Sequence, residues 1–126
     1  MPESIPEKVH LPDAFGQLHE PWRPRVVAAL NGQEVKLARL KGAFVWHHHA
    51  DEDELFLVWR GRFRMEFRDR TVDLGPGDLL VVPRGVEHRP VAEEEAEVLL
   101  FEPAGTRNTG NVVDPVLSAP ASDAGP

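Results

Sequence analysis

The sequence has no cysteine and no tyrosine among its 126 residues. Without cysteine the chain can form no disulfide bond, no thiolate metal site and no thiol nucleophile. Without tyrosine it has no phenol to serve as a general acid and no thioether cross-link between tyrosine and cysteine. Any metal or acid–base chemistry in this chain therefore has to come from histidine and carboxylate side chains.

Long apolar runs and an excess of positive charge are also missing. No apolar stretch approaches the length that spans a bilayer, and residues 1–15 lack the charged-then-apolar pattern of a signal peptide. We therefore expect a cytoplasmic protein without a membrane partner. The formal net charge of −7 repels phosphate backbones, so we expect no nucleic-acid partner either.

No ten-residue stretch shows convincing helical periodicity, whereas twelve prolines and ten glycines favour short strands joined by tight turns. The length allows one domain. We expect residues 1–20 to form an extended N-terminal arm, with room for a short helical turn but without a core element. Residues 21–112 are predicted to form a β-barrel domain, and residues 113–126 a disordered C-terminal tail.

The strands are predicted from turn residues and from side chains that alternate between apolar and polar. Asn31-Gly32 is typical of a two-residue hairpin turn, and Phe63, Met65 and Phe67 alternate with charged residues, which indicates one buried face. We expect a charged loop at 93–95. Strands are predicted at Arg25–Leu30, Gln33–Leu40, Phe44–His49, Glu54–Trp59, Arg62–Arg68, Asp78–Val82, Val86–Val91 and Glu97–Glu102. This many short strands predict an all-β sandwich or barrel.

Three segments break the alternation, because Leu55–Trp59, Leu79–Val82 and Val98–Phe101 are apolar at every position. In an antiparallel sheet such segments are typical of strands that are covered on both faces. The N-terminal arm is too short to cover the whole outer surface. We therefore expect a second subunit to cover part of it, and predict a homodimer.

The residues that could bind a metal or take part in catalysis cluster in two places. His47 and His49 are two residues apart, so on a strand they share one face, and His48 points to the other. Glu54 begins the next predicted strand on the face of Phe56, which is expected to be internal. A buried carboxylate costs several kcal/mol unless it is paired or binds a cation. A divalent metal would satisfy these groups together; a solvated histidine loop and a Glu54–arginine pair are the alternatives.

His88 is the fourth candidate ligand, on a strand that begins after the turn Pro83-Arg84-Gly85. It lies 34 residues beyond Glu54, so spacing alone cannot place it beside the other three. Closure of a barrel could bring it there. The alternative is a satisfied polar residue at the end of a strand.

Two motifs in this region resemble those of the cupin superfamily. The first is carried by Gly42, His47, His49, Glu54 and Gly61, and the second by Gly77, Pro83, Gly85 and His88. The resemblance implies a double-stranded β-helix, or jelly-roll barrel, in which His47, His49, Glu54 and His88 bind the metal. Two positions depart from the motifs: Gly42 precedes the first histidine by one residue fewer than usual, and Ala92 replaces a frequent asparagine. The wider stretch is similar to small single-domain cupins labelled mannose-6-phosphate-isomerase-like.

Three imidazoles and one carboxylate favour one divalent transition metal, namely Mn, Fe, Ni, Co or Zn. An octahedral ion with four protein ligands keeps two adjacent positions for a small-molecule ligand with neighbouring oxygens. The resemblance implies an isomerase, dioxygenase or lyase acting on a small oxygenated molecule. The alternative is a non-catalytic cupin module that binds a metal or small molecule. Catalytic residues stay unassigned, because no general base stands out, and the arginines at 60–70 are expected to face outward, which argues against a sugar-phosphate substrate.

Overall fold

The computed structural model describes residues 7–114, 117–118 and 122–123 of the chain. Almost all of its regular structure is strand, which confirms the predicted all-β class. In chain order the elements are α1 (Leu11–Gly16), β1 (Arg25–Leu30), β2 (Gln33–Ala43), β3 (Glu54–Arg60), β4 (Phe63–Phe67), β5 (Thr71–Leu74), β6 (Leu79–Val82), β7 (His88–Pro103) and β8 (Ser122–Asp123). Within this part of the chain no helix is long and apolar enough to cross a membrane.

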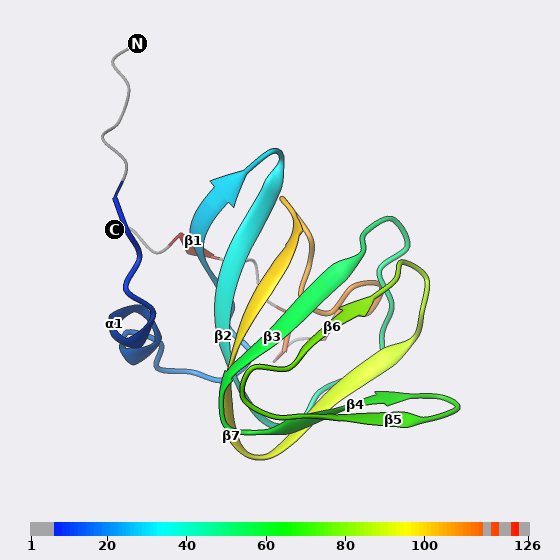
Figure 1. Ribbon diagram of the computed structural model, residues 1–126. Coiled ribbons are helices and arrows are strands. Elements are labelled where there is room, and N and C mark those ends of the chain that lie inside the picture. Colours follow the sequence, from blue (N-terminus) through cyan, green and yellow to red (C-terminus); the bar gives the residue numbers. More distant parts are fainter. Residues whose placement is uncertain (1–6, 115–116, 119–121, 124–126) are drawn as a thin grey trace.

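The strands form one strongly curved sheet in which β7 is the central element. β7 pairs antiparallel with β2, β3 and β4, and these bring in β1, β6 and β5 respectively. In Figure 1 the hairpin of β4 and β5 lies across the lower end of the wall that β2, β7 and β3 form. β7 pairs with strands of that wall and also with the β4–β5 hairpin, so the sheet folds around an interior.

The interior is filled by side chains that alternate along each strand. On β3, Phe56 and Val58 are buried, whereas Leu55 and Leu57 point to the outer face and are partly exposed. This alternation is what a strand with one internal face requires. The buried core residues are Ala38, Leu40, Phe56, Val58, Phe63, Met65, Leu74, Val82, Ala92, Ala96, Val98 and Leu100. They fill one end of the barrel and leave the other end to polar side chains.

The N-terminal arm contributes more to the core than its prolines suggest. α1 lies against the outer face of β2, where Phe15 and Leu18 bury Leu37 completely (Figure 1). Phe15 also stacks on Trp59, with ring centroids 6.4 Å apart. The expectation that the arm adds no core element is therefore wrong for these two residues, because an apolar outer face of the sheet was available for them to cover.

Two predicted strand boundaries are wrong. β2 ends at Ala43, and residues 44–49 run beside β7 with a single bridge, between His47 and His88. The predicted charged loop at 93–95 lies inside β7. The pairing of β2 with β7 shifts there, from Leu40 opposite Ala96 to Gly42 opposite Ala92, so the three glutamates form a bulge within a continuous strand.

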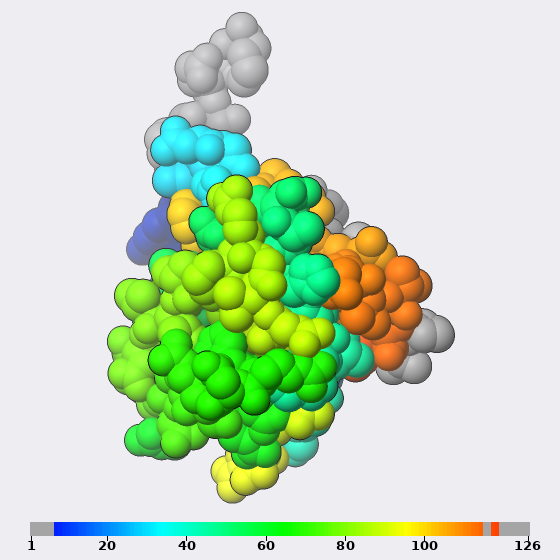
Figure 2. Space-filling view, turned by 90° about the vertical axis from the view of Figure 1, so that its right-hand side faces the viewer, coloured from blue at the N-terminus to red at the C-terminus, as the bar shows by residue number. Residues whose placement is uncertain are grey.

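The segment after β7 folds back beside the residues that connect β2 and β3. His48 and Asn111 exchange hydrogen bonds there, the His48 amide to the Asn111 side chain at 2.8 Å and the Asn111 amide to the His48 carbonyl at 3.1 Å. Figure 2 shows this segment in orange beside the residues that connect β2 and β3, which are blue-green. Of the predicted disordered tail, positions 115–116, 119–121 and 124–126 lie outside the described residues, whereas β8 pairs with β1.

Candidate metal centre

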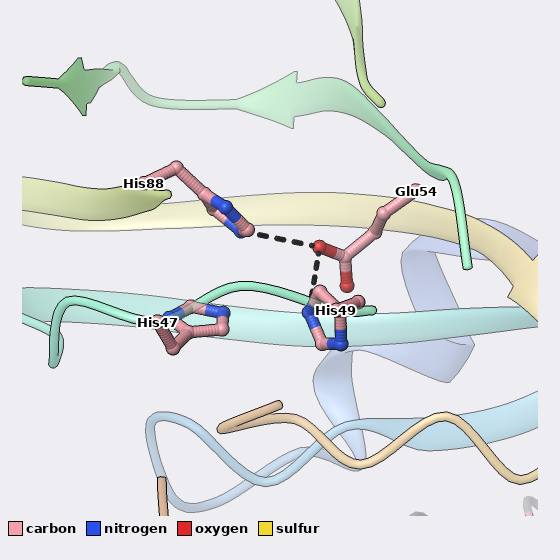
Figure 3. Close-up of side chains that lie close together, drawn as sticks. All are labelled: His47, His49, Glu54 and His88. Carbon is pink, nitrogen blue, oxygen red and sulfur yellow. Dashed lines mark ion pairs between the residues drawn. The ribbon is translucent and has the colours of Figure 1, made fainter. Parts of the chain in front are cut away.

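Three separate segments bring four candidate ligands to the polar end of the barrel. His47 and His49 lie on the stretch between β2 and β3, Glu54 is the first residue of β3, and His88 is the first residue of β7. All four side chains point toward one another in Figure 3. The structure thus joins the two motifs of the sequence, including His88, which spacing alone could not place.

The four side chains are almost completely removed from solvent, with exposed fractions of 2%, 4%, 3% and 0% for His47, His49, Glu54 and His88. One ligand atom from each lies within 4.8 Å of the ligand atoms of the others. Glu54 Oε1 lies 3.3 Å from His49 Nε2 and 3.5 Å from His88 Nε2 (Figure 3). Two donors about 2.1 Å from one ion can be separated by such distances.

The hydrogen bonds of the histidines show which nitrogens face the centre. The Nδ1 atoms of His47 and His88 each lie 2.9 Å from a backbone carbonyl, that of Val45 and that of Val86. A carbonyl can only accept, so each Nδ1 carries the proton and each Nε2 keeps its lone pair. Hydrogen bonds of this kind orient histidines that bind metals.

The arrangement leaves acceptor atoms facing each other. His49 Nε2, His88 Nε2 and Glu54 Oε1 are buried and have no hydrogen-bond partner within the described part of the chain. A lone pair on His88 Nε2 opposite a carboxylate oxygen is repulsive unless a cation lies between them, and buried polar atoms without a partner are costly. A divalent ion would satisfy these atoms at once, so the donor set fits a metal.

Burial also sets the charges of the centre. Burial, together with the neighbouring imidazole of His88, lowers the pKa of His47 from 6.5 to about 4. Burial alone would raise the pKa of Glu54, but the neighbouring side chains of Glu102, His49 and His88 hold it well below its ordinary value. Neutral imidazoles beside an anionic carboxylate are the protonation states in which these groups bind metals.

The sequence analysis did not find two charged residues that lie beside the centre, Glu102 and Lys36. Burial, reinforced by the neighbouring Glu54, raises the pKa of Glu102 to about 10. Lys36 Nζ donates to Glu102 Oε2 at 2.6 Å. Both residues occupy internal positions of strands that are otherwise apolar on that face, and this was the signal that could have identified them.

A cavity opens beside two of the candidate ligands, His47 and Glu54, with a free volume of about 40 Å³, room for about three water molecules. Its walls are mainly apolar, and Trp22 stacks on Phe44 there with ring centroids 4.5 Å apart. His47, Glu54, Glu102 and Asn108 supply its polar atoms. The other lining residues are Pro24, Ala38, Leu40, Phe56, Pro90 and Leu100. Of the described histidines only His47 lines this cavity, whereas His48 and His49 both line a second groove.

Known proteins resemble this chain in sequence. Residues 27–102 match the Cupin domain family. The chain is 34% identical over 87 residues to the uncharacterised protein YdbB of Bacillus subtilis, which covers 60% of this chain and 77% of that protein. It is 37% identical over 78 residues to an acireductone dioxygenase of Bacillus licheniformis, covering 58% of this chain but 44% of the enzyme. The chain thus spans less than half the length of that enzyme.

Solved structures resemble it as well. A protein of Shewanella frigidimarina that contains a cupin-2 domain is 42% identical, with a TM-score of 0.74 over 75% of this chain and 93% of that one. A protein of Neisseria meningitidis is 27% identical, with a TM-score of 0.72 over 78% of this chain and all of that one. Two sequence motifs, a curved antiparallel sheet and these matches agree on one family and its jelly-roll fold. The chain belongs to the Cupin domain family.

Proposed function

We propose that this protein is a metal-dependent enzyme of the dioxygenase type that acts on a small molecule with neighbouring oxygen atoms. One observation carries the proposal: three histidines and a glutamate converge within 4.8 Å beside an apolar cavity. Buried acceptor atoms without partners support a bound cation as the reason for this convergence.

The donor set supports a divalent transition metal, held by His47, His49, Glu54 and His88. Three imidazole nitrogens and one carboxylate oxygen suit Mn, Fe, Co, Ni or Zn, whereas Ca²⁺ prefers a shell of oxygens. When bound, such an ion supplies Lewis-acid polarisation of substrate oxygens and, if it is Fe, a route to reaction with dioxygen.

The chain's own residues supply orientation and a dry pocket. Val45 and Val86 fix the rings of His47 and His88 through their carbonyl groups. The stacked pair of Trp22 and Phe44 walls the cavity with apolar surface, which excludes water from the ligands.

Two observations favour dioxygenase over sugar-phosphate isomerase chemistry. The sequence relatives named above include an acireductone dioxygenase at 37% identity. Among the residues that the structure describes, no arginine or lysine lines the cavity, and a phosphorylated substrate needs such a cation to neutralise its charge. Arg64, one of the arginines at 60–70 expected to face outward, pairs with Glu66 in the structure.

The proposal is tested first by elemental analysis of untagged protein purified without chelators. We expect about one equivalent of transition metal, and its loss in His47→Ala. Protein loaded with Fe²⁺ is then assayed in an oxygen electrode with small enediols, diketones and hydroxy acids. Oxygen uptake that depends on both the metal and the substrate would support the proposal. Metal binding without turnover of any of these compounds would favour the alternative, a non-catalytic module that binds a small ligand, which the small cavity also suits.

We further propose a homodimer formed through the outer face of β3 and β6. Leu55 is opposite Val81 and Leu57 is opposite Leu79 in the sheet, so four apolar side chains form one patch. Leu79 is 61% exposed and Val81 48% exposed, whereas α1 packs on β2 and reaches β3 at Trp59. An exposed apolar patch of this kind suits contact with the same patch of a second copy, about a two-fold axis.

A further inference from the structure

Two residues form the solvent-facing rim of the cavity beside His47 and Glu54. Of the described residues that line this cavity, all are buried except Trp22 and Asn108, which are partly exposed. These two are joined to each other, because Asn108 Nδ2 donates a hydrogen bond to the Trp22 carbonyl at 3.2 Å. Within the described part of the chain, a molecule that enters this cavity from solvent therefore passes Trp22 and Asn108.

The backbone of Trp22 is strained at this rim. Its φ is +62°, in the left-handed region that bulky side chains rarely adopt. Glycine adopts this conformation without steric cost, whereas the Cβ of any other residue is crowded there. Backbone strain of this kind is found preferentially at binding sites, where the surrounding contacts hold it in place. The indole ring at position 22 therefore has to provide something that offsets the strain.

The indole ring of Trp22 is fixed relative to a candidate ligand. The Trp22 amide donates to the Arg39 carbonyl at 2.9 Å, and its Nε1 donates to the Lys41 carbonyl at 2.9 Å. The ring stacks on Phe44, whose ring in turn meets the imidazole of His47 edge-on, with centroids 5.4 Å apart. Because both its backbone and its side chain are held, the ring forms a rigid part of the cavity wall.

We propose that Trp22 is a specificity-determining residue of the site. Its fixed ring admits small oxygenated ligands and excludes those that carry an aromatic group beside the coordinating oxygens. This inference rests on the proposed function, since a ligand on a metal held by His47 and Glu54 extends from the metal into this cavity. If Trp22 only packed against Phe44, its loss would lower stability without changing the preference between two ligands. If ligands entered through the second groove, which His49 lines, its loss would not change that preference either.

Trp22→Gly is the discriminating substitution. It removes the ring and also relieves the left-handed backbone, so the strain relief partly offsets the lost stacking on Phe44 and the variant should fold. Trp22→Phe keeps an aromatic ring at the rim and should behave like the wild type. The matched control is Trp59→Ala, because the ring of Trp59 stacks on Phe15 and is not among the described residues that line the cavity.

The test compares acetohydroxamate with benzohydroxamate, two chelating ligands that share the metal-binding group and differ in a methyl against a phenyl substituent. Their dissociation constants for protein loaded with Co²⁺ are measured from the visible absorption of the bound ion. In Trp22→Gly we expect the ratio of the two constants to shift toward benzohydroxamate by about tenfold or more. Trp22→Phe and Trp59→Ala should keep the ratio of the wild type. A wild-type ratio in folded Trp22→Gly would overturn the role of Trp22.

A second measurement, on metal-free protein, separates failure of this inference from failure of the proposed metal site. Diethylpyrocarbonate modifies neutral imidazole, and mass spectrometry of peptides gives its rate at His47, with the exposed His10 as the internal reference. We expect His47 to react faster in Trp22→Gly than in the wild type, at an unchanged rate for His10. Equal rates at His47 would overturn the inference. A wild type that binds no Co²⁺ would overturn the proposed metal site, and the reaction of His47 would still decide whether Trp22 controls access.

Discussion

Two reciprocal backbone hydrogen bonds join His47 to His88. The amide of His47 donates to the His88 carbonyl at 3.0 Å, and the amide of His88 donates to the His47 carbonyl at 2.9 Å. The Gly85 amide adds a bond of 2.8 Å to the His49 carbonyl. The two segments that supply the three histidines are therefore fastened to each other through the backbone, so the frame of the site does not depend on any single imidazole.

Because the backbone holds the frame, His49→Ala should abolish metal binding and leave the β-fold in place. The loss of one of four donors should lower metal affinity by more than the 10- to 100-fold that outer contacts contribute. Metal content and circular dichroism measure the two effects. The matched control is His48→Ala, since His48 is not among the four side chains that converge on the centre. Equal metal content in His49→Ala and the wild type would contradict the assignment of His49.

The metal-free protein should lose stability as the pH falls through the range in which His47 titrates. Its pKa is about 4 in the folded state and 6.5 when unfolded, so between these values the unfolded chain binds more protons. Because of His47, the free energy of unfolding should fall by about 2 kcal/mol between pH 7 and pH 5. The loss begins near pH 6.5 and continues toward pH 4.

Urea unfolding with a chelator present, at pH 7 and at pH 5, measures this loss. In His47→Gln the titrating group is absent and the other groups are unchanged, so the difference between the two pH values should shrink by the same amount. An identical loss in the wild type and the variant would show that His47 does not carry it.

Gly61→Ala should destabilise the fold more than the same change at another glycine of similar backbone angle. Gly61 has φ +81°, and a Cβ there would lie 2.6 Å from the carbonyl oxygen of Glu95. The left-handed conformation costs an alanine about 1–2 kcal/mol, and the clash adds about 1–3 kcal/mol. Gly77, at φ +88° with open space around it, should show the first cost alone.

The free energy of unfolding of both variants, from urea titration, tests this comparison. Equal losses of unfolding free energy in Gly61→Ala and Gly77→Ala would contradict it. They would mean that the Glu95 backbone in β7 moves away from the new Cβ without a cost in free energy.

Leu79→Glu should weaken the proposed dimer by tenfold or more, equivalent to about 1.4 kcal/mol. A charge at this site would be buried against the same patch of the second subunit. Light scattering across a concentration series measures the association. Val113→Glu is the control, since Val113 is 76% exposed and lies outside the patch. A wild type that stays monomeric at high concentration would remove the dimer from consideration.

The local pattern of the sequence was enough to predict most strands and the four candidate ligands. Turn residues such as Asn31-Gly32 and the alternation of Phe63, Met65 and Phe67 act over a few residues, so they can be recognised without the fold. The bulge at residues 93–95 could not be predicted in this way, because a run of glutamates has the composition of a loop. Its place inside β7 depends on pairing with β2, and on Arg39 and Arg64, which pair with Glu95 and Glu93.

For the site, the sequence by itself determined that His47 and His49 share a face and that Glu54 begins an internal strand, since both follow from the two-residue period of a β-strand. Only the tertiary structure decided that His88 joins them and that Glu102, which contacts Lys36, lies beside Glu54. Those contacts link residues 34 or more positions apart, and closure of the sheet through β7 creates them. The register between strands sets such contacts, and it is a property of the whole barrel.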